Sequence, residues 1–144
     1  MVWLLRHGEA EEVAADDASR ALTPKGERQA KAAGEALAAL EIELDCCLSS
    51  PKVRALETAR IAAAVLGCEV EVIEALAGGD FDLAELTAGR GEALLVGHEP
   101  DFSRAIQLTT GARAALKKGG VAGIDGTTLG TLLKPAQLRL IARS

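Results

Sequence analysis

The chain has 144 residues, of which 49% are hydrophobic and 26% charged, and its formal net charge is −5. This size and composition predict one globular domain, residues 1–144, that buries roughly 70% of the surface its unfolded chain exposes. The acidic balance, the lack of a basic run and an aromatic content of 2% argue against nucleic-acid binding. The same balance would not steer the chain toward an acidic partner.

The cysteines and the apolar runs indicate a cellular location. Cys46, Cys47 and Cys68 are odd in number and form no CxxC pair, so they predict neither a disulfide framework nor a zinc site. No apolar run approaches the length of a membrane-spanning helix, and four apolar residues before Arg6 are too few for a signal peptide. We therefore expect a cytoplasmic location, with no metal and no cofactor.

The first third of the chain predicts a strand, a loop and a helix. Residues 2–5 are an apolar run of strand length, and a polar loop follows through Ser19. Thr23 is a good N-cap and Pro24 suits the first helical position. Apolar residues then recur at three- and four-residue steps through residue 40, which predicts one buried helical stripe.

The middle of the chain predicts a second strand over 45–50. Ser50 is expected to cap a helix with Pro51 in its first turn, and Gly67 is expected to end that helix. Residues 69–73 alternate polar and apolar, which predicts a half-exposed strand. Residues 77–91 predict a loop with a short helix around 83–86.

The last third of the chain starts with an apolar strand over 92–98. Pro100 and Asp101 are expected to open the next helix. Residues 117–134 predict a hairpin whose turn contains Asp125 and Gly126, and the tail predicts a short closing helix. The lysines at 117 and 118 are expected in a solvated turn, and nothing in the sequence supports their contact with a protein substrate.

Strands that alternate with helices predict a three-layer αβα domain around a mostly parallel sheet, with an antiparallel edge strand from the hairpin. In such open sheets ligands bind outside the carboxyl ends of the strands. The first predicted strand ends at Arg6 and His7, the second ends just before the helix that carries Arg54, and the fourth ends at His98. Each of these residues alone has an ordinary structural explanation, but their convergence predicts a pocket for a dianion such as inorganic phosphate or sulfate.

Four segments resemble motifs of the histidine phosphatase superfamily, also called the phosphoglycerate mutase-like superfamily. "LLRHGEA" resembles its Arg-His-Gly signature, "LSSPKVRALETA" its Ser-Ser-Pro, Arg and Thr-Ala motif, and "LLVGHEP" its strand ending in Gly-His. "DASRALTPKG" is similar to a segment of the short branch that contains the SixA-type phosphohistidine phosphatases. The motifs occur in family order, so the resemblance implies the phosphoglycerate mutase-like fold.

The resemblance also implies a role for each matching residue. His7 matches the nucleophile that is transiently phosphorylated, Arg6 and Arg54 match the phosphate-clamping arginines, and His98 matches the second pocket histidine, expected to be a protonated donor. Gly8 and Arg20 match substrate-binding positions, Arg20 with Asp17 near it and with Ala21 where the branch often has Pro. Larger mutases carry an acidic proton donor on an inserted segment, and Glu74 and Asp80 are the weak candidates for it here.

The implied reaction is phosphate removal through a phosphohistidine enzyme intermediate. A phosphoramidate nitrogen leaves without a dedicated acid, so the missing acid favours phosphohistidine on a protein, for example a phosphorelay domain. Two alternatives remain open. One is a small-molecule phosphomonoesterase of the same superfamily, which would need a working acid. The other is a non-catalytic module that reads a phosphorylated partner.

Overall fold

A computed structural model describes residues 1–144. Its six-stranded sheet has the order β3-β2-β4-β1-β5-β6. The strands are β1 (Val2–Arg6), β2 (Cys46–Ser49), β3 (Val70–Val72), β4 (Ala93–Gly97), β5 (Val121–Asp125) and β6 (Thr128–Leu133). The helices are α1 (Pro24–Ala39), α2 (Val53–Leu66), α3 (Leu83–Thr87), α4 (Asp101–Thr110) and α5 (Pro135–Ala142), with short 3₁₀ turns η1 (Asp17–Ser19) and η2 (Glu74–Ala77).

The sheet combines a parallel part with an antiparallel edge. β1 pairs in parallel with β4, β4 with β2, and β2 with β3. The hairpin formed by β5 and β6 adds to the other side of β1 in the antiparallel sense. This mixed sheet confirms the predicted fold class, and the antiparallel edge comprises both strands of the hairpin.

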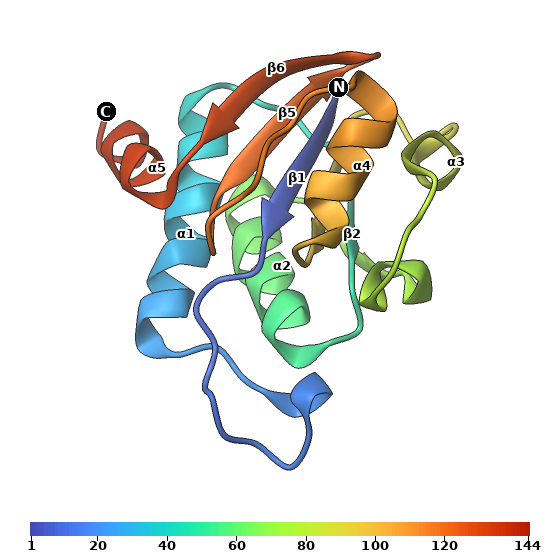
Figure 1. Cartoon of the computed structure of the whole chain (residues 1–144). Coiled ribbons are helices and arrows are strands. Elements are labelled where there is room, and N and C mark those ends of the chain that lie inside the picture. The colour runs from blue at the N-terminus through green and yellow to red at the C-terminus, as the bar shows by residue number, and fades with distance from the viewer.

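Alternation along the buried strands builds a core on each face of the sheet. In β1, Trp3 and Leu5 pack with α1, α2 and α5, whereas Leu4 packs with α4 and α3 on the opposite face. Successive side chains of a strand point to opposite faces, and β1 is buried on both, so its apolar run is continuous. The helices accordingly lie on both sides of the sheet (Figure 1). None of them is both long enough and apolar enough to cross a membrane.

The predicted helix signals hold with one exception. Thr23 caps α1 by accepting from the N–H of Gly26, and Gly67 ends α2 with a φ of 72°. The prediction that Ser50 caps α2 is wrong, because the helix begins at Val53 and Lys52 occupies its N-cap position. Ser50 instead lies at the end of β2, where its hydroxyl is free to take part in the site.

Candidate active site

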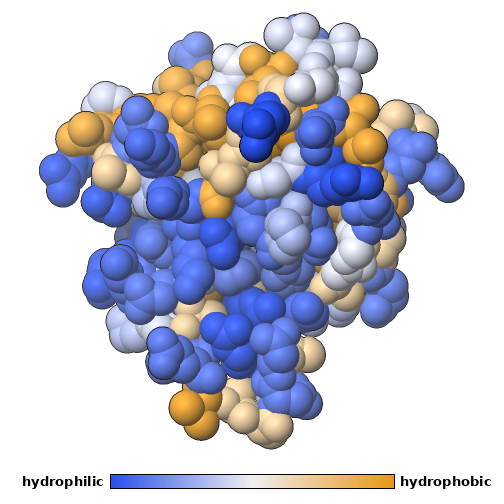
Figure 2. All heavy atoms as spheres, in the orientation of Figure 1, coloured by the Kyte–Doolittle hydropathy of each residue, from blue (hydrophilic) through white to orange (hydrophobic).

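The ends of three parallel strands form one edge of a pocket of about 460 Å³. Arg6 pairs in register with Gly97, and the N–H of His7 donates to the carbonyl of Gly97 at 3.0 Å. The N–H of Ser50 donates to the carbonyl of Val96 at 3.0 Å. Five of the predicted site residues line this pocket: Arg6, His7, Arg20, Arg54 and His98. In Figure 1 this edge lies where the β1 arrow ends, and Figure 2 shows that this part of the visible face is mainly hydrophilic.

His7 is buried as a neutral ring, in a tautomer that leaves one ring nitrogen free to act as a nucleophile. Its Nδ1 lies 2.7 Å from the carbonyl oxygen of Gly8. A carbonyl only accepts, so Nδ1 carries the ring proton and Nε2 keeps its lone pair. Burial, followed by the charges of Arg54 and Arg6, lowers the pKa of His7 to about 4, against the opposing effect of the Gly8 hydrogen bond. His7 is therefore neutral at pH 7.

His98 lies beside His7, with ring centroids 5.2 Å apart. Its Nε2 is 2.7 Å from the hydroxyl oxygen of Ser50, which also accepts from the N–H of Lys52 at 3.1 Å. Burial is the main cause that lowers the pKa of His98 to about 3, and the neighbouring His7 and Arg54 add to it. The expectation of a protonated His98 is thus wrong for the free protein, because burial disfavours the charged form of the ring and the nearby Arg54 repels it.

The two arginines are anchored at their tips and unpaired along one edge. Arg6 donates from Nη1 to the carbonyl of Leu116 at 2.9 Å. Arg54 donates from Nη1 to the carbonyl of Asp17 at 2.8 Å and from Nη2 to the carboxylate of Asp17 at 3.2 Å. These contacts fix each guanidinium plane and leave both Nε atoms without a partner.

Three buried side-chain polar atoms in the chain have no hydrogen-bond partner in the protein: Nε of Arg6, Nε of Arg54 and Nδ1 of His98. A buried polar group without a partner costs about 1–3 kcal/mol, so proteins rarely leave one without a reason. All three atoms belong to residues predicted for the site. They are donors, or can be donors, and their three residues line the same pocket as His7. Their lack of a partner points to an anion with several oxygens as the missing acceptor.

The loop after β1 carries Asp17, whose carboxylate pairs with three cationic side chains that line the pocket. Asp17 contacts Arg20 at 3.1 Å, Arg54 at 3.2 Å and Lys52 at 3.5 Å. The hydrogen bonds from Arg20 and Arg54 lower the pKa of Asp17 to about 2. Arg20 also donates from Nε to the carbonyl of Glu11 at 2.7 Å, which holds its guanidinium at the pocket.

Gly8 is not among the residues that line the pocket, and its contact with substrate stays a prediction. Its N–H donates to the hydroxyl of Thr58 at 3.1 Å, and that hydroxyl donates to the carbonyl of Arg54 at 2.7 Å. A Cβ at Gly8 would lie 2.5 Å from the carbonyl oxygen of Gly26, and a Cβ at Gly26 would lie 2.0 Å from that of Glu9. The glycines therefore allow the loop after β1 to lie against the start of α1.

The candidate proton donors proposed from the sequence lie elsewhere. Glu74 and Asp80 are exposed and do not line the pocket, and Asp80 pairs with Arg104 at 3.4 Å. The acids that do line it are Glu99, which directly follows His98, and Asp101, which is three residues after His98. Their position after the strand that ends in Gly-His is the signal that sequence reasoning missed.

Glu99 and Asp101 differ in what they can do. The carboxylate of Glu99 accepts from the N–H and hydroxyl of Ser103 and from the N–H of Leu116, so it acts as a hydrogen-bond acceptor. Through Leu116 it also supports the contact that anchors Arg6. Asp101 accepts only from the N–H of Gly79, at 3.3 Å, and burial raises its pKa.

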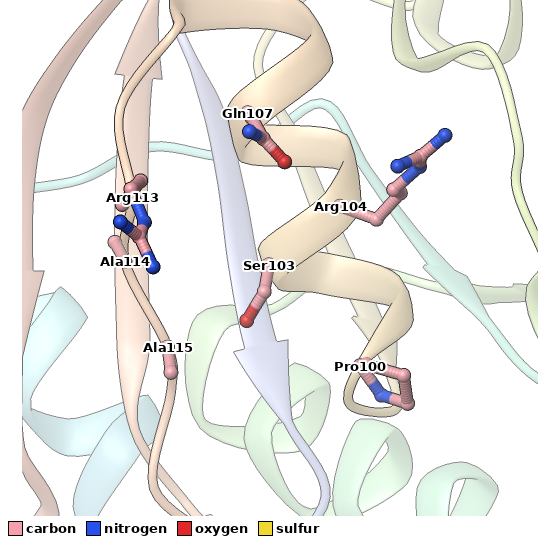
Figure 3. A pocket seen from close by; sticks show the side chains of 7 residues that line it. All are labelled: Pro100, Ser103, Arg104, Gln107, Arg113, Ala114 and Ala115. Carbon is pink, nitrogen blue, oxygen red and sulfur yellow. The ribbon is translucent and has the colours of Figure 1, made fainter.

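A separate hollow of about 450 Å³ lies between α4 and the segment that follows it. Figure 3 shows Ser103 and Gln107 of α4 on the side toward the segment that carries Arg113, whereas Arg104 points away. This hollow contains neither histidine. It therefore lies outside the candidate active site.

The charges around the pocket favour an anion. Its cationic lining residues are Arg6, Arg20, Lys52, Arg54 and Lys118, and its acidic ones are Glu99 and Asp101. This excess of positive charge stands against a chain of formal net charge −5. No group of three or more His, Cys, Asp or Glu side chains is arranged to hold a metal ion. A neutral imidazole facing fixed cationic donors can attack phosphorus and stabilise the charge on its equatorial oxygens.

Comparison with known proteins agrees with this chemistry. The model of the histidine phosphatase superfamily, branch 1, matches residues 2–106. An uncharacterized protein of a Picosynechococcus strain is 38% identical over 138 residues, which cover 85% of this chain and 83% of that protein. A structure of the protein histidine phosphatase SixA complexed with tungstate superposes with a TM-score of 0.83 at 23% identity and covers 95% of this chain and 98% of that one.

The same fold also occurs in an enzyme named for a small substrate. A putative alpha-ribazole-5'-P phosphatase from Escherichia coli superposes with a TM-score of 0.72 at 19% identity and covers 93% of this chain and 96% of that one. The fold alone therefore does not choose a substrate. The match to the family model over most of the length, together with the SixA-like architecture, shows that this chain belongs to the histidine phosphatase superfamily, branch 1, and is a phosphatase of that superfamily.

Proposed function

We propose that residues 1–144 form one histidine phosphatase domain that removes phosphate from phosphohistidine on a protein, for example a phosphorelay domain. The observation that carries the proposal is the set of three unpaired buried atoms on Arg6, Arg54 and His98, residues that line the same pocket as the neutral ring of His7. Such an arrangement suits a phosphoryl group during transfer, because its oxygens gain charge that the fixed donors stabilise.

The reaction would proceed in two displacements. The lone pair on Nε2 of His7 attacks phosphorus, the P–N bond of the substrate breaks, and its electron pair stays on the leaving imidazole, which takes up a proton. Water then attacks phosphorus, the P–Nε2 bond breaks, and inorganic phosphate leaves while the water proton passes to solvent. Arg6 and Arg54 would hold the equatorial oxygens in both steps, and neutral His98 would donate from Nδ1.

The leaving group supports phosphohistidine over an alcohol. Glu99 already accepts hydrogen bonds from three donors within the protein, so its carboxyl group is held away from the role of a proton donor. An imidazole leaving group needs less help from an acid than an alkoxide does. Sequence reasoning sought such an acid at Glu74 and Asp80, and both are exposed outside the pocket.

Asp101 favours a second candidate, a small-molecule phosphomonoesterase. Its carboxyl group lines the pocket and burial raises its pKa, which are properties of a proton donor to an alkoxide. An Asp101→Asn variant separates the two candidates. If the monoesterase is correct, this variant loses monoester hydrolysis by about 100-fold or more. If the phosphohistidine reaction is correct, turnover of phosphohistidine stays within a few-fold of wild type.

The experiment compares a phosphohistidine protein, a phosphohistidine peptide and an alkyl phosphomonoester, whose alkoxide leaving group needs an acid, as substrates for wild type, His7→Ala and Asp101→Asn. We expect the highest kcat/KM for the phosphohistidine protein and no turnover by His7→Ala. Faster turnover of the monoester would refute the proposed substrate. Binding of the phosphoprotein without turnover would identify a non-catalytic reader. The cytoplasmic location remains a prediction from the cysteines, which the structure leaves as free thiols.

A further inference from the structure

A second hollow, of about 550 Å³, lies beside the active-site pocket and is strongly basic. Residues from the start of α1, the segment before β5 and the start of α5 line it. Its cationic side chains are Arg6, Lys25, Lys117, Lys118, Lys134 and Arg139, and its single carboxylate is Glu9. We call this feature the basic groove. Six cations against one acid is the reverse of the charge balance of the whole chain.

Most of the charge in the basic groove is not neutralised within the protein. Lys25 pairs with Glu9 at 3.5 Å. The other five cations take part in none of the ion pairs within 4.0 Å that the structure contains. The first residues of α5, Pro135 and Ala136, also line the groove, so the positive end of that helix lies beside it. Like charges that line one hollow repel one another, and an anionic occupant would relieve the repulsion.

The basic groove is continuous with the active site. Arg6 and Lys118 line both hollows. A polypeptide whose phosphoryl group lies at His7 would therefore bring its neighbouring residues to the groove. Lys117 and Lys118 are exposed, as the sequence predicts, and they line the basic groove together with Arg6 and the start of α5.

We propose that the basic groove binds an acidic segment, rich in Asp and Glu, that flanks the phosphorylated residue of the protein substrate. The proposal rests on the proposed phosphohistidine phosphatase function and adds a specificity determinant to it. Lys25, Lys117, Lys134 and Arg139 are exposed. Long, exposed, flexible side chains can pair with the carboxylates of a flexible segment, because each cation can adjust its position to that of a carboxylate. Complementary charge at the rim of a site mainly raises the association rate and the preference for one partner over another.

The test uses two phosphohistidine peptides that differ only in their flanks, one acidic and one neutral. The groove variant is Lys117→Glu/Lys134→Glu. The matched control is Lys31→Glu/Arg60→Glu, which makes the same charge change at exposed positions outside the groove. The readout is the ratio of kcat/KM for the acidic peptide to that for the neutral one.

We expect wild type and the control variant to prefer the acidic peptide by roughly ten-fold at low salt, and the groove variant to lose that preference. High salt should reduce the ratio in wild type, since exposed charges are screened. A ratio near one in wild type would overturn the proposal. So would an equal loss of preference in the groove and control variants.

A binding measurement separates this proposal from the activity on which it rests. The unphosphorylated acidic peptide is titrated into wild type, the groove variant and the control variant, with fluorescence anisotropy as the signal. If neither phosphopeptide is hydrolysed, the proposed substrate is wrong, yet binding that only the groove variant loses still supports the groove. Tripolyphosphate is titrated in the same way. If it binds wild type but not the groove variant, and the acidic peptide binds neither, the occupant is a small polyanion and the proposed protein segment is wrong.

Discussion

Acidification should destabilise the free protein through its two histidines. Folding buries His7 and His98 as neutral rings and lowers their pKa values to about 4 and about 3, from the ordinary value of 6.5. As the pH falls below 6.5, the unfolded chain takes up protons at these rings before the folded chain does. The free energy of unfolding therefore falls with pH, beginning near 6.5 and continuing until the folded rings are protonated.

The size of this effect follows from the pKa differences. Each unit of difference corresponds to about 1.4 kcal/mol. Between about pH 7 and about pH 4.5 each ring alone would contribute roughly 2 kcal/mol to the loss. The rings lie 5.2 Å apart and face an open pocket, so up to about 5 kcal/mol is the upper limit for the pair. That is a large share of the total stability of a small domain, about 5–15 kcal/mol.

Urea denaturation of wild type and a His7→Gln/His98→Gln variant at several pH values measures this loss. Carboxyl groups contribute to both proteins, so the difference between the two curves isolates the histidines. We expect wild type to lose more stability than the variant as the pH falls from about 7 to about 4.5, by about 2 kcal/mol or more. Parallel curves would show that the rings do not carry the depressed pKa values that the geometry requires.

Two further predictions concern the anion pocket. Arg54→Lys should lower kcat/KM for phosphohistidine by about 100-fold, because lysine cannot replace two guanidinium contacts and a free Nε; a loss of less than about ten-fold would contradict the clamp. Inorganic phosphate at about 100 times its Kd should raise the free energy of unfolding by about 2.7 kcal/mol, measured by urea denaturation, and an equal gain in Arg6→Ala/Arg54→Ala would place the anion elsewhere.

The sheet and the convergence of the strand ends could be predicted from the sequence because the signals are local. The run at residues 2–5 is apolar without alternation, as expected of a strand buried on both faces, and the structure covers β1 on both faces. The hairpin signal at Asp125 and Gly126 likewise corresponds to β5 and β6, with Gly126 at a φ of 60°. Each of these patterns can be interpreted from neighbouring residues alone, without knowledge of the tertiary structure.

The protonation state of the site histidines and their hydrogen-bond partners could not be predicted from the sequence, because both depend on distances between residues that are far apart in the chain. His98 was expected to be protonated, but its burial beside His7 and the cations lowers its pKa. Ser50 was expected to cap a helix, but the later start of α2 leaves its hydroxyl for Nε2 of His98. The basic groove is lined by residues from separate parts of the chain, so no local run of positive charge in the sequence predicts it.

The most direct test of the catalytic chemistry is to trap the phosphorylated enzyme. Wild type and His7→Ala are mixed rapidly with a phosphohistidine peptide, quenched in base, digested, and analysed by mass spectrometry for phosphate on each histidine. We expect an acid-labile, base-stable phosphate on His7 in wild type and none in His7→Ala, with His98 unmodified in both. Phosphate on His98, or rapid turnover with no phosphorylated histidine at any time, would show that His7 is not the nucleophile.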